Sequence, residues 1–156
     1  MTFEHTADYG MVEMILTNPR CYRMMVSDLA PPRAEFRMSG GNYTPILCRA
    51  DDGLILGMFL LVPLTGQSAE VHLCFVPSAW GQVEEAGKQF LAWIWRETHL
   101  QTLLGPVPSY NRLALRVAKA CGFREAYTEK VNATRDNAPF NRIVTRIERP
   151  ASELTQ

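Results

Sequence analysis

Residues 69–81 read AEVHLCFVPSAWG and lead into a helical pattern that continues to about residue 98. Apolar and more polar residues alternate from Ala69 to Phe75, which is the period-two pattern of a strand. Pro77 ends that strand because it has no N–H to donate, and Gly81 is expected to let the backbone turn tightly into the helix. A strand that turns through glycine into a helix presents free N–H groups, which commonly bind a phosphate. An ordinary strand–helix connection in an α/β domain has the same pattern.

The composition is that of a folded protein with a sizeable core. The chain has 156 residues, 47% hydrophobic and 21% charged, which suits a single domain. The 16 basic and 16 acidic residues cancel, so charge gives no argument for nucleic acid or for an anionic membrane as a partner. No apolar run reaches the length of a membrane span, and the start at Met1–His5 lacks a signal pattern. A cytoplasmic protein is expected.

The metal-binding residue types are scattered along the chain. No two cysteines have CxxC spacing, so reduced core thiols are expected rather than a disulfide framework or a zinc site. The histidines are equally far apart, which gives a metal site little support. The residues concerned are Cys21, Cys48, Cys74, Cys121, His5, His72 and His99.

The first half of the chain predicts short helices followed by an antiparallel meander. A strand is expected at 2–6, a helix capped by Asp8, and a second helix that begins at Pro19. Its methionine-rich face could pack in the core or line an adaptable pocket. Strands at 44–50 and 54–62, joined by an Asp-Gly turn, should pair with the strand that contains Glu70.

The second half predicts a strand–helix–strand unit, another helix and a closing hairpin. The helix from about residue 82 to 98 should connect Glu70's strand to a parallel strand at 102–108. Gly105 and its neighbouring prolines cannot all sit in a regular ladder, so the sheet should splay there and form a cleft. A helix from Asn111 should stop at Gly122 in the left-handed conformation. Strands at 124–131 and 140–148, a polar loop at 132–139 and a loose tail at 150–156 complete the expected domain of residues 1–149.

Two segments resemble the GNAT superfamily of acetyl-CoA-dependent N-acyltransferases. Residues 69–81 are similar to the family's fourth strand and pyrophosphate loop. Residues 111–123 (NRLALRVAKACGF) are similar to its N-x-x-A/S-x-x-apolar-x-x-x-x-G-F helix. The likeness is nearest to the ribosomal-protein and protein N-terminal acetyltransferase branch, and also extends to GNAT-like proteins of tailed phages. It implies an α/β (α+β) fold with a mixed, mostly antiparallel sheet of six to seven strands, helices on both faces and a splayed parallel pair.

The chain departs from the family pattern at two places. Val83 and Glu85 stand where the phosphate loop usually has small residues, and an acidic side chain there opposes an anion. Either the loop is reshaped around Trp80 and Gly81, or Gly87 belongs to a shifted register, or cofactor binding is weakened. Ala118 also stands where many members have a tyrosine that protonates the leaving thiolate.

Acetyl transfer to nitrogen needs a base for the amine proton and donors for the thioester carbonyl. Glu70 and His72 lie on one face of the strand beside the expected cleft, and either could be the base; ordinary sheet-surface roles are the alternative. The hydroxyl of Tyr110 or Ser109 could replace the missing acid.

The resemblance also implies a set of acetyl-CoA contacts. The backbone of Phe75 and Val76 would pair with the pantetheine arm, and N–H groups at 81–83 would bind the pyrophosphate. Asn111 would bind the arm or the acceptor through its side chain, unless it simply caps its helix. Arg112 and Arg116 could meet the 3′-phosphate, unless they form a solvated face. The implied cofactor-binding residues are Phe75, Val76, Gly81, Gln82, Val83, Asn111 and Arg116.

The sequence therefore predicts an N-acetyltransferase that moves an acetyl group from acetyl-CoA to a primary amine by direct attack. The alternative is a catalytically silent GNAT-fold protein with a binding or structural role, possibly phage-encoded. The acceptor, a protein or a small molecule, is left open. Its pocket is expected to come from residues 8–42 and 132–139, and a homodimer is possible.

Overall fold

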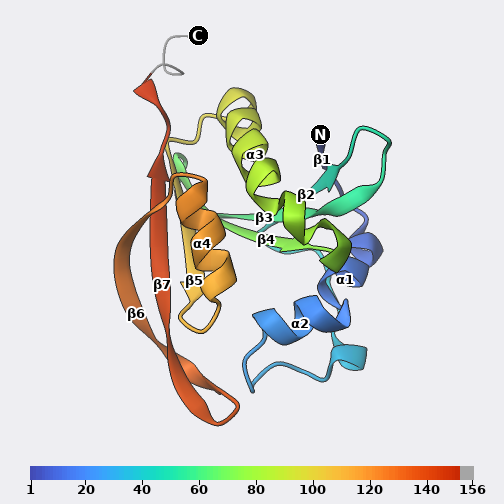
Figure 1. Cartoon of the computed structure of the whole chain (residues 1–156), viewed down its shortest axis with the longest axis vertical. Helices are drawn as coiled ribbons and strands as arrows, with labels where there is room; N and C mark the ends of the chain where they lie inside the picture. The colour runs from blue at the N-terminus through green and yellow to red at the C-terminus, as the bar shows by residue number, and fades with distance from the viewer. Residues whose placement is uncertain (152–156) are drawn as a thin grey trace.

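The computed structural model describes residues 1–151, which form one seven-stranded sheet with helices on both faces (Figure 1). The strand order is β1-β2-β3-β4-β5-β7-β6, and every neighbouring pair is antiparallel except the parallel pair β4–β5. This is the fold class that the sequence predicts. Most of the predicted tail at 150–156 lies outside the described residues. The strands are β1 (Thr2–His5), β2 (Thr44–Arg49), β3 (Ile55–Pro63), β4 (Ser68–Phe75), β5 (Thr102–Pro108), β6 (Arg124–Arg135) and β7 (Ala138–Glu148); the α-helices are α1 (Tyr9–Leu16), α2 (Pro19–Met25), α3 (Val83–Glu97) and α4 (Arg112–Ala120), with 3₁₀ helices at Arg33–Glu35 and Pro77–Gln82.

The core has two layers because successive strand residues point to opposite faces of the sheet. On one face, Phe59 of β3 stacks on Phe90 of α3 with ring centroids 3.9 Å apart. On the other face, Met58 and its neighbours pack against Val12 and Ile15 of α1. Helices that cover both faces leave the central strands buried, which explains their near-continuous apolar sequence.

The sheet opens between β4 and β5, as predicted. These two strands pair only from Ser68–Thr102 to Glu70–Leu104. Beyond that point β5 stays paired with β7 as far as Pro108, and its prolines have no N–H to offer β4. Gly105 is held to β7 closely: Thr145 donates its hydroxyl to the Gly105 carbonyl at 2.8 Å, and a Cβ on Gly105 would lie 2.8 Å from that hydroxyl oxygen. The remaining lengths of β4 and β5 therefore form two separate walls.

The predicted polar loop at 132–139 was wrong, because β6 and β7 continue through it. They meet at a two-residue turn in which Asp136 and Asn137 have φ of 50° and 61°. This is the backbone conformation of the hairpin turns that favour Asp and Asn. The hairpin is the long curved arm at the edge of the sheet in Figure 1.

Asp28, just after α2, holds the tip of this hairpin. Its carboxylate accepts hydrogen bonds from the Thr134 hydroxyl at 2.6 Å and from the N–H groups of Asp136 and Asn137 at 2.9 and 3.0 Å. The Asp28 N–H donates to the Thr134 carbonyl at 2.8 Å. These hydrogen bonds, chiefly the one from Thr134, lower the pKa of Asp28, because they favour its charged form. The segment after α2 is thereby fixed to the far end of the sheet.

Asp28→Ala is expected to loosen the hairpin tip, since two backbone N–H groups lose their acceptor. Amide exchange at Asp136 and Asn137 should become faster by at least about 10-fold, the equivalent of one ordinary hydrogen bond. Because the Asp28 pKa is lowered in the folded state, the wild-type clamp should be intact above the ordinary range of an aspartate and be lost as pH falls through the lowered value. Asp52→Ala, which removes an aspartate from the β2–β3 turn, is the control. Unchanged exchange in the Asp28 variant would contradict the clamp.

The segment after β4 is not the glycine turn that the sequence predicts. Residues Pro77–Gln82 form a 3₁₀ helix that runs directly into α3. Gly53 and Gly122 are the glycines with positive φ in the described chain, at 86° and 94°. A Cβ on Gly81 would meet nothing within 4 Å, so the turn does not require glycine there. The predicted left-handed stop at Gly122 is confirmed.

Gly87 has a packing role that explains why α3 contains a glycine. A Cβ on Gly87 would lie 2.6 Å from the Cys121 Sγ at the end of α4. The Cys121 thiol also donates to the Glu84 carbonyl at 3.6 Å. Gly87 therefore lets α3 and α4 approach closely.

Gly87→Ala should lower the free energy of unfolding by about 1–2 kcal/mol, because the cost of overpacking exceeds the helix-propensity gain of alanine. In a Cys121→Ala background the same change should instead stabilise the protein, by roughly 0.5–1 kcal/mol. Denaturant unfolding of the four variants in this cycle measures both effects. A destabilisation of equal size in the two backgrounds would refute the contact.

Candidate functional site

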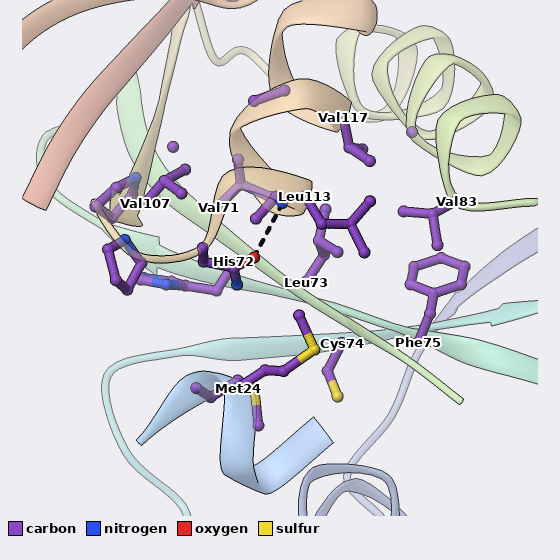
Figure 2. A pocket seen from close by; sticks show the side chains of 18 of the residues that line it. Met24, Val71, His72, Leu73, Cys74, Phe75, Val83, Val107, Leu113 and Val117 are labelled. Carbon is purple, nitrogen blue, oxygen red and sulfur yellow. Dashed lines mark hydrogen bonds between the residues drawn. The ribbon is translucent and has the colours of Figure 1, made fainter. Parts of the chain in front are cut away.

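A cavity of about 460 Å³ lies where β4 and β5 separate. One wall is β4, with His72, Leu73 and Phe75, and the facing wall is α4, with Leu113 and Val117 (Figure 2). Most of the lining is apolar, and a few polar groups interrupt it. α2 contributes Cys21, Met24 and Met25, α3 contributes Val83, Gly87, Phe90 and Leu91, β5 contributes Gly105 to Pro108, and the hairpin contributes Val131, Ala133, Phe140 and Arg142.

His72 and Glu70 form a pair on the α2-facing side of β4. The His72 Nε2 lies 3.2 Å from a carboxylate oxygen of Glu70. The side chains are 40% and 24% exposed, respectively. His72 lines the cavity and Glu70 does not, so the histidine is the member that a bound molecule can reach. The carboxylate is placed to orient its ring.

The end of β4 is partly occupied by the protein itself. The Phe75 carbonyl accepts from the Trp80 indole N–H at 2.9 Å and from the Cys21 thiol at 3.1 Å. The Val76 N–H donates to the Leu56 carbonyl at 2.9 Å, so it is not available to a ligand in the predicted way. Successive backbone N–H groups of a strand point to opposite edges. Because the Val76 N–H points to β3, the N–H groups of Leu73 and Phe75 face the gap between β4 and β5.

The segment at 81–83, which was expected to bind a pyrophosphate, is not a loop with free N–H groups. The Val83 N–H donates to the Trp80 carbonyl, and the Val83 side chain is buried in the core. The first turn of α3 carries Glu84 and Glu85. The Lys88 ammonium, 2.7 Å from Glu84, keeps the pKa of that carboxyl below its usual value, and the charge of Arg116 adds to the effect. Positive and negative charges are therefore mixed around the helix start.

Asn111 acts as the cap of α4, the plainer of its two predicted roles. Its side-chain oxygen accepts from the Ala114 N–H at 3.1 Å, which satisfies a donor of the first helical turn. Ala118, at the position where a tyrosine was expected in the family, lines the cavity without a polar group.

Tyr110 places a hydroxyl beside the cavity. The hydroxyl oxygen is buried and has no hydrogen-bond partner within residues 1–151. Its ring packs edge-on against Phe140 with centroids 5.0 Å apart, and the Arg135 guanidinium lies 4.2 Å above it. A buried hydroxyl without a hydrogen-bond partner is rare in folded proteins, so a bound ligand is expected to supply the partner of the Tyr110 hydroxyl.

Cys21 and Cys74 both line the cavity, and their thiols donate to the carbonyls of Phe75 at 3.1 Å and Ile15 at 3.8 Å, respectively. The neighbouring Cys74 side chain lowers the pKa of Cys21, and the Cys21 side chain, together with burial, raises the pKa of Cys74. Cys21, Cys48 and Cys74 are buried, which confirms their predicted place in the core, whereas Cys121 is half-buried. No group of three or more His, Cys, Asp or Glu side chains in the described chain could hold a metal ion. Within the same residues, no helix combines the length and apolarity that a membrane crossing requires.

The structure brings half of the predicted site residues to one cavity. The lining includes His72, Phe75, Val83, Tyr110 and Asn111; it does not include Glu70, Val76, Gly81, Gln82 or Arg116. Trp80 and Arg142 line the cavity although the sequence did not assign them to the site, whereas Met24 and Arg135 fall in the ranges 8–42 and 132–139 that were expected to supply the acceptor pocket. Trp80 adjoins the predicted phosphate segment, and its position there was the available signal. Arg142 lies within the strand predicted at 140–148, where nothing local marked it as a site residue.

The chain matches the acetyltransferase (GNAT) domain family over residues 2–124. It therefore belongs to this family, whose members use acetyl-CoA as the acetyl donor. A search of curated proteins found no match.

Solved structures of N-acetyltransferases share the whole fold. Spermidine N-acetyltransferase from Vibrio cholerae, crystallised with CoA and spermine, is 13% identical with a TM-score of 0.78, covering 99% of this chain and 98% of that one. A putative phosphinothricin N-acetyltransferase is 18% identical with a TM-score of 0.71, covering 94% and 97%. At these identities the likeness concerns the fold alone.

Proposed function

We propose that the protein transfers an acetyl group from acetyl-CoA to a primary amine by direct attack within the β4–β5 cavity. The observation that supports this proposal is the unpaired edge of β4, which opens onto an apolar cavity with His72 in its wall. An extended chain with amide groups can add to such an edge as a further strand would. The pantetheine arm of acetyl-CoA is an extended chain with amide groups, so it could pair with β4 in this way.

In the proposed reaction, the amine nitrogen attacks the thioester carbonyl, and the carbon–sulfur bond breaks as the thiolate leaves. His72 takes the proton that the amine loses, since it lines the cavity. Glu70 is a positioning residue, because it touches the His72 ring at 3.2 Å and does not line the cavity. The Tyr110 hydroxyl is the proposed proton donor to the thiolate, in place of the tyrosine that Ala118 replaces.

Donor binding is proposed to use the backbone of Leu73 and Phe75 for the arm and the surface around Gly81, Gln82 and Arg116 for the phosphates. The pantetheine arm suits its part of the site, because the cavity is apolar and the edge of β4 is unpaired there. The phosphate end offers Arg116 and Lys88 against Glu84 and Glu85, so binding should be weaker and more sensitive to salt than at a wholly basic site.

A second candidate is a GNAT-fold binding protein without transferase activity. The 3₁₀ helix at Pro77–Gln82, the engaged Val83 N–H and the acidic first turn of α3 favour it. Calorimetric titration with acetyl-CoA separates the two functions. The proposed enzyme gives a binding heat and acetyl-dependent release of free CoA, whereas the absence of binding at millimolar acetyl-CoA would leave only the second candidate.

His72→Ala is expected to lower kcat by about 100-fold or more, because it removes the base from the wall of the cavity. Imidazole in solution should restore part of the rate, which a purely structural role would not allow. Glu70→Gln should cost roughly 10-fold, as expected when a partner that orients a histidine is lost. His99→Ala, an exposed histidine after α3, is the control. A His72 variant with full activity would remove this residue from the mechanism.

A further inference from the structure

A second hollow of about 280 Å³ adjoins the cavity at the start of α4. The two hollows share Tyr110, Asn111 and Leu113 from this region and Met24 from α2. The smaller one adds Arg112 and Arg135. It therefore lies at the end of the site that faces α2 and the β6–β7 hairpin, away from the start of α3.

The polar groups around this hollow are nearly all hydrogen-bond donors. Two are guanidinium groups, and the Tyr110 hydroxyl is buried without a partner within residues 1–151. The side-chain oxygen of Asn111 is used by the Ala114 N–H, which leaves its NH₂ as the free end. Among residues 1–151, no aspartate or glutamate lines either hollow. The hollow therefore offers hydrogen-bond donors without a carboxylate to accept from them.

The two arginines differ in how they are held. Arg135 is fixed by its position 4.2 Å above the Tyr110 ring and by a bond to the Val26 carbonyl at 3.4 Å. Its nearest carboxylate is Asp136, at 4.0 Å and 93% exposed. Arg112 lies on the exposed side of α4 and forms no ion pair within residues 1–151. One cation is thus pre-organised and the other can close over a bound group.

We infer that this hollow binds the carboxylate of the acetyl acceptor, so that the acceptor is a small amine with an acid group, such as an amino acid. A planar carboxylate can accept two parallel hydrogen bonds from a guanidinium, which leaves the Tyr110 hydroxyl for the leaving thiolate. A polyamine would instead bring positive charge to two arginines, and the carboxylates near Arg135, those of Asp136 and Asp28, line neither hollow. This inference rests on the proposed function, because it names the acceptor of that same site.

Direct binding tests the subsite without any transfer reaction. Arginine side-chain N–H signals in ¹⁵N-labelled protein can be followed during titration with the common α-amino acids, their carboxamides and spermidine. At least one amino acid should shift the Arg135 signal, and its carboxamide and spermidine should not. Arg135→Gln should abolish the response of the Arg112 signal to that amino acid, whereas Arg124→Gln, at the start of β6, should preserve the response of both arginines. The absence of a response to every amino acid, or an equal response to the carboxamides, would overturn the subsite.

Steady-state kinetics then separate the two proposals. With an amino acid acceptor, Arg135→Gln should raise the acceptor KM by roughly 10- to 100-fold, the loss of a charge-assisted pair, with little change in kcat or in the KM for acetyl-CoA. Binding without transfer would refute the proposed reaction and leave the subsite standing. Transfer to spermidine or to carboxamides with an unchanged acceptor KM in Arg135→Gln would refute the subsite and leave the reaction standing.

Discussion

The early end of the β4–β5 pairing is the constraint on which the rest of the structure depends. Parallel pairing stops at Glu70–Leu104 because the prolines of β5 cannot donate to β4 and because Gly105 is tied to Thr145 of β7. The two halves of the sheet then diverge, and the cavity forms between them. His72, Tyr110 and the unpaired edge of β4 meet there only because this gap exists.

The two ends of the site are built differently. At the α3 end the protein satisfies its own polar groups: Trp80 donates to the Phe75 carbonyl, and Val83 donates to Trp80. At the α2 end, the Tyr110 hydroxyl has no hydrogen-bond partner within residues 1–151, and two arginines lie around it. The Asp28 clamp joins the segment after α2 to the hairpin that carries Arg135, so it holds the two sides of that end together.

Much of the fold could be predicted because local chemistry determines it. The alternation around Glu70 identifies a strand, Asn111 and Gly122 delimit a helix, and Gly105 with its prolines indicates the splay. The turn at Asp136–Asn137 was missed because a polar stretch resembles a loop until a distant residue, Asp28, satisfies its N–H groups. The roles of Trp80 and Arg135 depend on contacts between segments far apart in the chain, which local patterns do not determine.

The central claim is that acetyl-CoA adds to the open edge of β4. Residue-resolved amide exchange with and without acetyl-CoA tests it most directly, because the Leu73 and Phe75 N–H groups face the gap, whereas the His72 N–H faces β3. Exchange at Leu73 and Phe75 should slow by roughly 10-fold or more at saturating ligand, and by more than at His72, which reports only the general stabilisation that binding gives the folded state. Protection confined to other parts of the chain, or none at all, would contradict this claim.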